Sequence, residues 1–204
     1  MERKKRKTFE RAREIFHTHN GILRTAQAKK LGIAEPILAQ MYKAGLLVKE
    51  SRGLYRLAGM SPLSYPDFVQ VSIKVPNSVI CLVSALNYHN LTTQIPYQVY
   101  IALPRAQTAP RFEYPPLNII HLSDEAYQAG IEEYLLDSIC VRIYCREKTV
   151  ADCFKFRNKI GQDVALEALK DYLRQPERNL DKLQRYARID RVEKVIRPYI
   201  EAAL

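Results

Sequence analysis

Residues 25–57 read TAQAKKLGIAEPILAQMYKAGLLVKESRGLYRL, and this stretch decides the fold expected for the N-terminal part of the chain. A first short helix is expected with Thr25 as its N-cap and Gly32 at its end. A second is expected with Pro36 in its first turn and Gly45 at its end. Two apolar segments around a polar turn follow, which is the pattern of a β-hairpin. Helices joined by a tight turn and followed by a hairpin predict a winged helix-turn-helix.

The second helix has one side suited to packing and another suited to contact with a partner. On the outer side, Gln40 can pair with adenine through two hydrogen bonds, and Lys43 can donate to guanine or to phosphate. An ordinary solvated surface is the alternative interpretation of these two residues. The packing side comprises Ile37, Leu38, Met41 and Ala44, and the outer side comprises Glu35, Ala39, Gln40, Tyr42 and Lys43.

Basic and hydroxyl side chains around this fold are further candidates for DNA contact. Phosphate contacts are expected at the start of the first helix, and a minor-groove or phosphate contact is expected at the tip of the wing. A basic segment precedes a helix expected over residues 7–19, and we favour an arm along the DNA over a frayed tail. The predicted DNA contacts are Arg3, Lys4, Lys5, Arg6, Lys7, Arg24, Thr25, Lys29, Gln40, Lys43 and Arg52.

Net charge is segregated along the chain. Residues 1–60 contain 14 Lys and Arg against 5 Asp and Glu, a net charge of +9 out of +10 for all 204 residues. Residues 61–204 therefore carry a net charge of only +1. Lys and Arg side chains neutralise phosphates and release condensed counterions, so a basic segment joined to a nearly neutral one predicts nucleic-acid binding by one end of the chain.

The remaining composition is that of a folded protein without a metal or cofactor. Hydrophobic residues make up 47% of the chain, which can fill real cores. The four cysteines lack the spacing of a zinc site, and free thiols in a reducing compartment fit better. Neither a signal peptide nor a membrane helix is recognisable. A cytoplasmic protein with no metal, no cofactor and no membrane contact is expected.

Residues 61–204 are expected to form a larger α+β domain that follows a boundary near residue 60. A buried helix is expected over residues 80–91, and strands of a small mixed sheet over residues 98–103, 117–122 and 139–145. From residue 149 onward, apolar residues at helical spacing predict a set of C-terminal helices. The expected class is therefore α+β, with an N-terminal winged helix-turn-helix over residues 1–60.

Four segments together resemble the AbiEi family of bacterial antitoxins: RGLYRL (52–57), ICLVSALNYHNLT (80–92), QIPYQVYIALPR (94–105) and REKTVADCFKFRNKIGQDVALEALKDYL (146–173). The resemblance implies an autorepressor that binds repeats in its own promoter, as double-stranded DNA, through the winged helix. It also implies that the second domain counteracts a cognate nucleotidyltransferase toxin. In such type IV abortive-infection systems, a stable toxin–antitoxin complex is not expected.

The segment KTVADCFKFR is the polar motif of the second domain, and two interpretations of it remain open. Thr149 and Asp152 have the spacing of a capping box at the start of a helix. Alternatively, Lys148, Thr149, Asp152 and Arg157 form an exposed patch used in antitoxicity.

Two other classes of function were compared with this interpretation. A metal-dependent nuclease needs a Glu and a Lys two positions apart on one strand, whereas Glu147 and Lys148 are adjacent. A nucleotidyltransferase or kinase is not expected either, because the sequence has no Gly-rich phosphate loop, so no catalytic residue is expected. A stand-alone winged-helix regulator without antitoxin activity is the closer alternative, and a nucleotidyltransferase gene downstream would argue against it.

Overall fold

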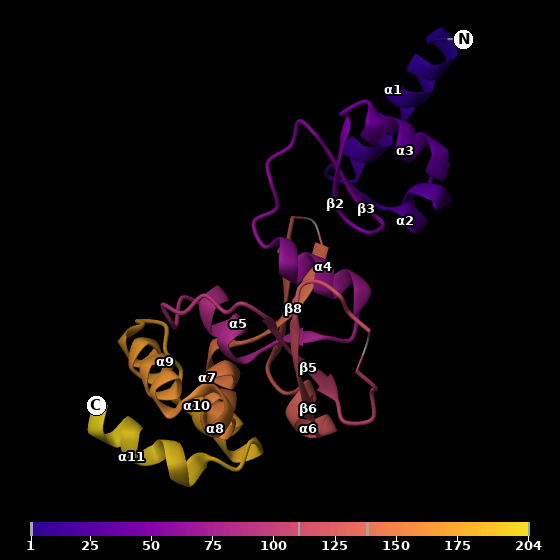
Figure 1. Cartoon of the computed structure of the whole chain (residues 1–204). Coiled ribbons are helices and arrows are strands. Elements are labelled where there is room, and N and C mark those ends of the chain that lie inside the picture. Colours follow the sequence, from indigo (N-terminus) through magenta and orange to yellow (C-terminus); the bar gives the residue numbers. More distant parts are fainter. Residues whose placement is uncertain (1, 110, 138, 204) are drawn as a thin grey trace. The chain divides into compact units, whose positions relative to one another are not determined.

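The computed structural model describes residues 2–109, 111–137 and 139–203, without the side chains of residues 2–5. It divides the chain into two units (Figure 1). Unit 1 comprises Met1–Pro66 and Leu135–Ser138, and unit 2 comprises Asp67–Tyr134 and Ile139–Leu204. Each unit has its own hydrophobic core, and together they confirm the α+β class. The helices among the described residues are all too short or too polar to cross a membrane.

Unit 1 is a three-helix module with a small antiparallel sheet of order β1-β3-β2. The hairpin predicted from the sequence is present as β2 and β3, whereas β1, which pairs with β3, was not predicted. Three residues are too few to show the alternation by which a strand is recognised. The elements are α1 (Glu2–Thr18), β1 (Ile22–Arg24), α2 (Thr25–Lys30), α3 (Glu35–Lys43), β2 (Leu47–Ser51) and β3 (Leu54–Leu57).

The ends of α2 and α3 follow the glycine positions expected from the sequence. Gly32 has a φ of +86°, and the next amide, that of Ile33, donates to the carbonyl of Ala28 at 2.8 Å. Gly45, with a φ of +70°, ends α3 in the same way. Both ends are Schellman motifs, in which a left-handed residue lets backbone amides satisfy the last carbonyls of the helix. The turn of the helix-turn-helix is thus held by backbone hydrogen bonds.

The start of α2 differs from the prediction that Thr25 is its N-cap. Arg24 is the N-cap and makes no side-chain cap hydrogen bond, and Thr25 is already the first helical residue. The chain passes from β1 into α2 without a loop, so the Thr25 amide donates to the carbonyl of Gly53 in the wing turn at 2.8 Å. This hydrogen bond to Gly53, which is distant in sequence, takes the place of the side-chain cap expected from Thr25.

The rotation of α3 is set by Leu38 and Met41, which are buried in the core of unit 1 together with Phe16 of α1. Ile37 is half-buried, in agreement with the predicted packing side. Ala44 was also predicted to pack, but it is exposed. It is the C-cap residue, where the helix already opens into the turn.

The basic N-terminal segment is not an extended arm. Its backbone belongs to α1, which begins at Glu2, five residues before the predicted start. Lys and Arg are good helix formers, and Arg6 pairs with Glu10 one turn later at 3.1 Å. Arg6 and Lys7 are exposed, whereas the side chains of Arg3, Lys4 and Lys5 lie outside the described part of the structure.

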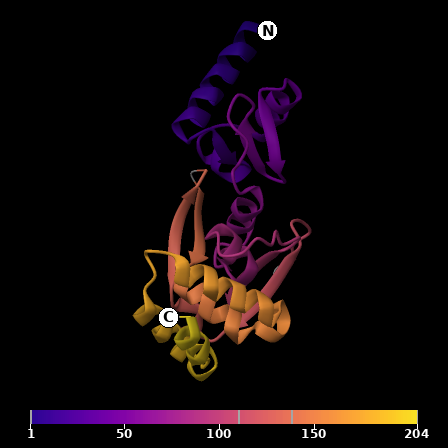
Figure 2. The same cartoon turned by 90° about the vertical axis from the view of Figure 1, so that its left-hand side faces the viewer.

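Unit 2 has a five-stranded sheet of order β6-β5-β4-β8-β7, with the C-terminal helices together on one side of it (Figure 2). β4 pairs antiparallel with β5 and parallel with β8, and β5 pairs parallel with β6, which confirms the mixed sheet. The predicted strands are β5, β6 and β8, and β4 and β7 were missed. The elements are α4 (Pro66–Lys74), β4 (Val79–Ile80), α5 (Leu82–Tyr88), β5 (Val99–Pro104), β6 (Leu117–Leu122), α6 (Asp124–Gln128), β7 (Ile131–Leu136), β8 (Ile139–Tyr144), α7 (Arg146–Lys155), α8 (Arg157–Ile160), α9 (Gln162–Arg174), α10 (Leu180–Ile189) and α11 (Glu193–Ala203).

α7 is the central helix of unit 2. It packs against α5, α9 and α10, and all of its residues from Glu147 to Phe154 are buried. A helix buried on every side has no face on which charged residues can meet water, so the charges that it carries need partners inside the protein.

Candidate nucleic-acid interface

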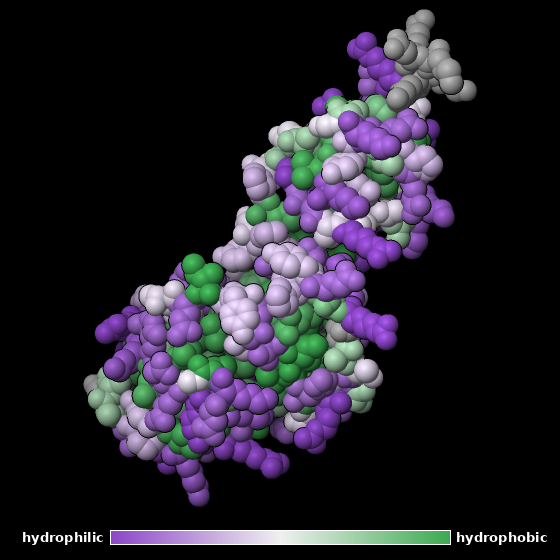
Figure 3. Space-filling view, in the orientation of Figure 1, coloured by the Kyte–Doolittle hydropathy of each residue, from purple (hydrophilic) through white to green (hydrophobic). Residues whose placement is uncertain are grey.

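The outer side of α3 is exposed as predicted. Glu35, Ala39, Gln40, Tyr42 and Lys43 all face solvent, and none of them packs in the core of unit 1. On the face of unit 1 drawn in Figure 3, hydrophilic side chains in purple surround smaller apolar areas in green. The first turn of α3 contributes Glu35 and Pro36, and Lys43 lies in its last turn. The helix therefore presents an amide and an ammonium group to solvent, one turn apart.

The wing is a hairpin with Arg52 exposed at its turn. Its base is held by Arg56, which is buried and pairs with the carboxylate of Glu50. The Arg56 guanidinium also donates to the carbonyls of Leu57, at 3.2 Å, and of Met60. Sequence reasoning did not single out Arg56. The sequence does hold a signal for this ion pair, because Glu50 and Arg56 are opposite charges on the two sides of the hairpin turn.

The start of α2 lies beside the wing turn. Arg24 is the register partner of Leu54, and the amide of Thr25 bonds to Gly53. Arg24 and Thr25 are half-buried, whereas Lys29 is exposed. Burial lowers the pKa of Arg24, but a guanidinium keeps its charge in proteins. Two of the predicted phosphate contacts are therefore brought next to the wing.

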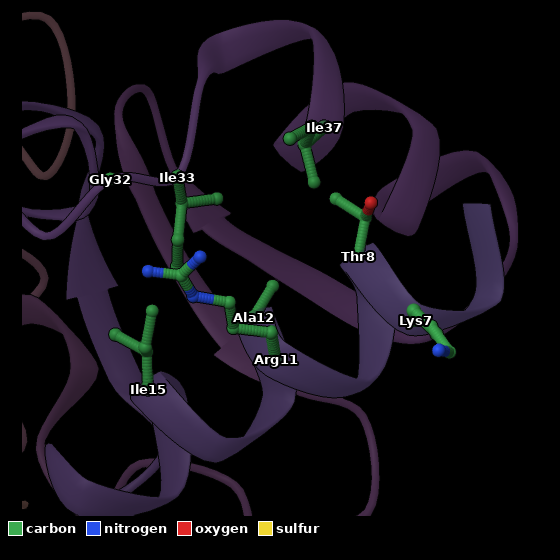
Figure 4. Close-up of a pocket in the computed structure, with 8 residues that line it drawn as sticks. All are labelled: Lys7, Thr8, Arg11, Ala12, Ile15, Gly32, Ile33 and Ile37. Carbon is green, nitrogen blue, oxygen red and sulfur yellow. The ribbon is translucent and has the colours of Figure 1, made fainter. Parts of the chain in front are cut away.

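A pocket of about 280 Å³ lies between α1 and the helix-turn-helix (Figure 4). Ala12, Ile15, Ile33 and Ile37 form its apolar lining, and Lys7, Thr8 and Arg11 of α1 also line it. The volume lies just below the range of about 300–1,000 Å³ that is usual for small-molecule sites. We assign no ligand to it.

Three of the four residues of the predicted antitoxicity patch are not on the surface. Lys148 and Thr149 are 0% exposed and Asp152 is 1% exposed, so the expectation of an exposed patch is wrong for these three residues. The capping-box interpretation is wrong as well, because α7 begins at Arg146 and has Cys145 as its N-cap. Thr149 donates its hydroxyl to the carbonyl of Tyr144 at 3.2 Å, one turn inside the helix.

Lys148, Asp152 and Asp190 form a buried charge cluster, with the half-buried Lys155 at its edge. The ammonium of Lys148 donates to Asp152 and, at 3.1 Å, to Asp190, which is the C-cap of α10. Lys155 reaches Asp190 from about two turns further along α7, also at 3.1 Å. The cluster therefore ties α7 to the end of α10. The sequence pattern did not identify Asp190, which lies 42 residues from Lys148.

Burial sets the protonation of this cluster. It raises the pKa of Asp152 to about 7, since the loss of hydration and the neighbouring Asp190 carboxylate outweigh the attraction of Lys148. The pKa of Lys148 is also raised, because its two carboxylate partners overcome the opposing effect of burial. Oδ2 of Asp152 has no hydrogen-bond partner among the described residues. The lysine thus stays charged, and Asp152 titrates near neutral pH.

The other polar residues singled out from the sequence have structural contacts. Arg157 is half-buried and donates to the carbonyl of Phe154 at 2.7 Å. His89 is buried and bonds to the carbonyl of Tyr144 at 2.7 Å, and burial lowers its pKa. Three of the four cysteines are buried, and Cys140 is exposed.

Comparison with known proteins relates unit 1 to one family. The sequence model of the family described as AbiEi antitoxin, transcriptional regulator, matches residues 10–58. The match includes the C-terminal half of α1 and all of the helix-turn-helix and wing, and it confirms the resemblance for this part of the chain. A search of curated proteins finds no match.

One solved structure shares the fold over most of the chain. It is the crystal structure of RV2827C protein from Mycobacterium tuberculosis, with a TM-score of 0.53 and 13% sequence identity. The similarity covers 81% of this chain and 66% of that one, so this chain spans just under two thirds of the length of that protein. At this identity the comparison shows a common fold alone.

Proposed function

We propose that the chain is a transcriptional autorepressor that also acts as the antitoxin of a type IV toxin–antitoxin system. The observation that carries this proposal is the winged helix-turn-helix of unit 1, which matches AbiEi antitoxin regulators over residues 10–58. Residues 1–60 would bind double-stranded promoter DNA, and residues 61–204 would counteract a nucleotidyltransferase toxin. Neither activity requires a catalytic residue of this chain.

The DNA interface is supported by charge and exposure. Residues 1–60 carry a net charge of +9, and Gln40, Lys43 and Arg52 all face solvent on α3 and the wing. In such a complex, the recognition helix contacts base edges in the major groove, and the wing beside it contacts phosphates. Arg24 and Thr25 at the start of α2 would add phosphate contacts next to the wing, with Lys29 and the exposed cations of α1 extending them.

Binding is tested with the full chain and DNA from upstream of its own gene. Fluorescence anisotropy should show tighter binding to this DNA than to a shuffled sequence of equal length. Gln40→Ala should reduce this preference, and a reporter driven by the same promoter should be repressed by the wild type and released by the variant. Equal affinity for promoter and shuffled DNA would contradict autorepression.

The antitoxin role is proposed for residues 61–204, outside the matched segment. The nearly neutral net charge of this part gives it little attraction to DNA, which fits a separate task. With three of the predicted patch residues buried, the half-buried Arg157 is the member that a partner can reach.

Growth rescue tests this role. The full chain and its Gln40→Ala variant are each expressed together with the nucleotidyltransferase encoded beside it. Both should restore growth to the same level, and the two proteins should elute separately in size-exclusion chromatography. If neither protein restores growth while both are folded, the chain is a regulator without antitoxin activity.

A further inference from the structure

The exposed stripe of α3 contains few hydrogen-bond donors for a helix that would read DNA. Pro36, Ala39, Gln40 and Lys43 recur at the i, i+3, i+4, i+7 spacing of one helix face, and all four are exposed. Leu38 and Met41, buried on the other side, set the rotation of the helix within unit 1. The stripe therefore points away from the core.

The N-terminal part of a recognition helix is the part that reaches base edges. Here this part carries Glu35, Pro36, Ala39 and Gln40, and the amide of Gln40 is the one side-chain donor among these four. Guanine presents two acceptors in the major groove, and its usual partners are Arg and Lys. The carboxylate of Glu35 accepts hydrogen bonds only, so it cannot bond to the two acceptors of guanine, and its base-edge partners are the amino groups of adenine and cytosine.

Adenine and thymine match this face instead. Adenine presents one acceptor and one donor, which the amide of Gln40 satisfies with its own donor and acceptor. Thymine adds a C5-methyl group, for which carbon surfaces such as those of Pro36 and Ala39 are suitable partners. Lys43 stands one turn beyond Gln40, in the last turn of α3, and is the other side-chain donor of the stripe.

We propose that α3 reads A·T base pairs, with the Gln40 amide on adenine and the carbons of Pro36 and Ala39 against thymine methyl groups. This inference rests on the DNA binding proposed for unit 1, and it names the base pairs that are read there.

The experiment starts by selecting a preferred site for the full chain from random duplex oligonucleotides. The selected site is then made with uracil in place of thymine, which removes only the C5-methyl group, and separately with 7-deazaadenine, which removes only the N7 acceptor. The 7-deazaadenine replacement should weaken binding by about fivefold, the lower end of the discrimination given by a bidentate base contact. Loss of the thymine methyl group should weaken binding by up to about fourfold, the effect of one buried methylene-sized group.

Two variants assign the effects to side chains. Ala39→Gly should bind the thymine and uracil sites with nearly equal affinity, because the methyl group of the protein is gone. Ala44→Gly is the matched control, since Ala44 is also exposed but is the C-cap residue of α3, at the opposite end of the helix from Pro36 and Ala39, and it should keep the preference for thymine. Gln40→Ala should lose the sensitivity to 7-deazaadenine. Thermal melts of each variant verify folding.

The possible results separate this inference from the proposed function. Selection of guanine-rich sites, or equal binding of natural and modified sites, would overturn A·T reading and leave DNA binding in place. If the selection enriches no sequence, and the chain binds no duplex better than random DNA, both A·T reading and the proposed promoter binding are wrong. Loss of thymine preference in Ala44→Gly to the same degree as in Ala39→Gly would remove the assignment to Ala39.

Discussion

Lys148→Met should destabilise unit 2 more than any surface substitution in it. The ammonium of Lys148 lies between Asp152 and Asp190, and all three side chains are buried. Methionine keeps most of the volume, but it leaves Asp190 with Lys155 alone and takes from Asp152 the cation with which it pairs. Removing one partner of a buried ion pair costs about 3–5 kcal/mol. Domains are stable by about 5–15 kcal/mol, so this loss is a large share of the total.

The measurement is urea unfolding of the full chain, followed by circular dichroism. With a slope of about 2 kcal/mol per molar urea, the midpoint of the unit 2 transition should fall by roughly 2 M. Hydrogen exchange of the backbone amides in α7 identifies the unit that is weakened, because these amides should lose protection while those of α3 keep theirs.

Lys155→Met is the matched control, since it removes a cation from the same cluster. The side chain of Lys155 is 29% exposed, so its pair with Asp190 is partly screened by solvent. Its loss should cost about 1 kcal/mol or less. If Lys148→Met shifts the midpoint no further than Lys155→Met, the buried cation does not hold α7 to α10, and the reasoning is wrong.

Four further predictions concern both units. Burial raises the pKa of Asp152 to about 7, so the native state keeps a proton that the unfolded state releases near pH 4. The free energy of unfolding should therefore fall as pH rises from about 4 to about 7. In thermal melts recorded over this pH range, Asp152→Asn should flatten the dependence. Gly130→Ala should lower the melting temperature of unit 2, because Gly130 has a φ of +74° and an added Cβ would lie 2.6 Å from Cβ of Lys148. Arg56→Ala should destabilise unit 1 by about 2 kcal/mol in urea unfolding, since it leaves a partly buried carboxylate without its partner. Arg24→Ala should weaken binding to all DNA sequences alike and reduce the slope of log affinity against log salt by roughly 0.9, and an unchanged slope would remove Arg24 from the phosphate contacts.

The helix-turn-helix was largely predictable because its signals are local. Gly32 and Gly45 end their helices through left-handed backbone conformations that each residue adopts by itself, and the hairpin turn depends on a few adjacent residues. The exposed side of α3 follows from helical spacing around two apolar positions. The same locality explains the misplaced cap at Thr25, since only the folded chain brings its amide to Gly53.

Burial of charge was decided by the tertiary structure alone. Lys148 and Asp152 looked like surface residues, because isolated charges are almost never buried without a partner. Their partner Asp190 lies 42 residues after Lys148, at the end of another helix, and no periodic pattern connects the two. The strands β4 and β7 were missed for a related reason, since they are defined by the neighbours with which they pair. The sequence by itself determined what each short segment prefers, whereas the ion pairs inside unit 2 and the full strand order exist only once distant segments meet.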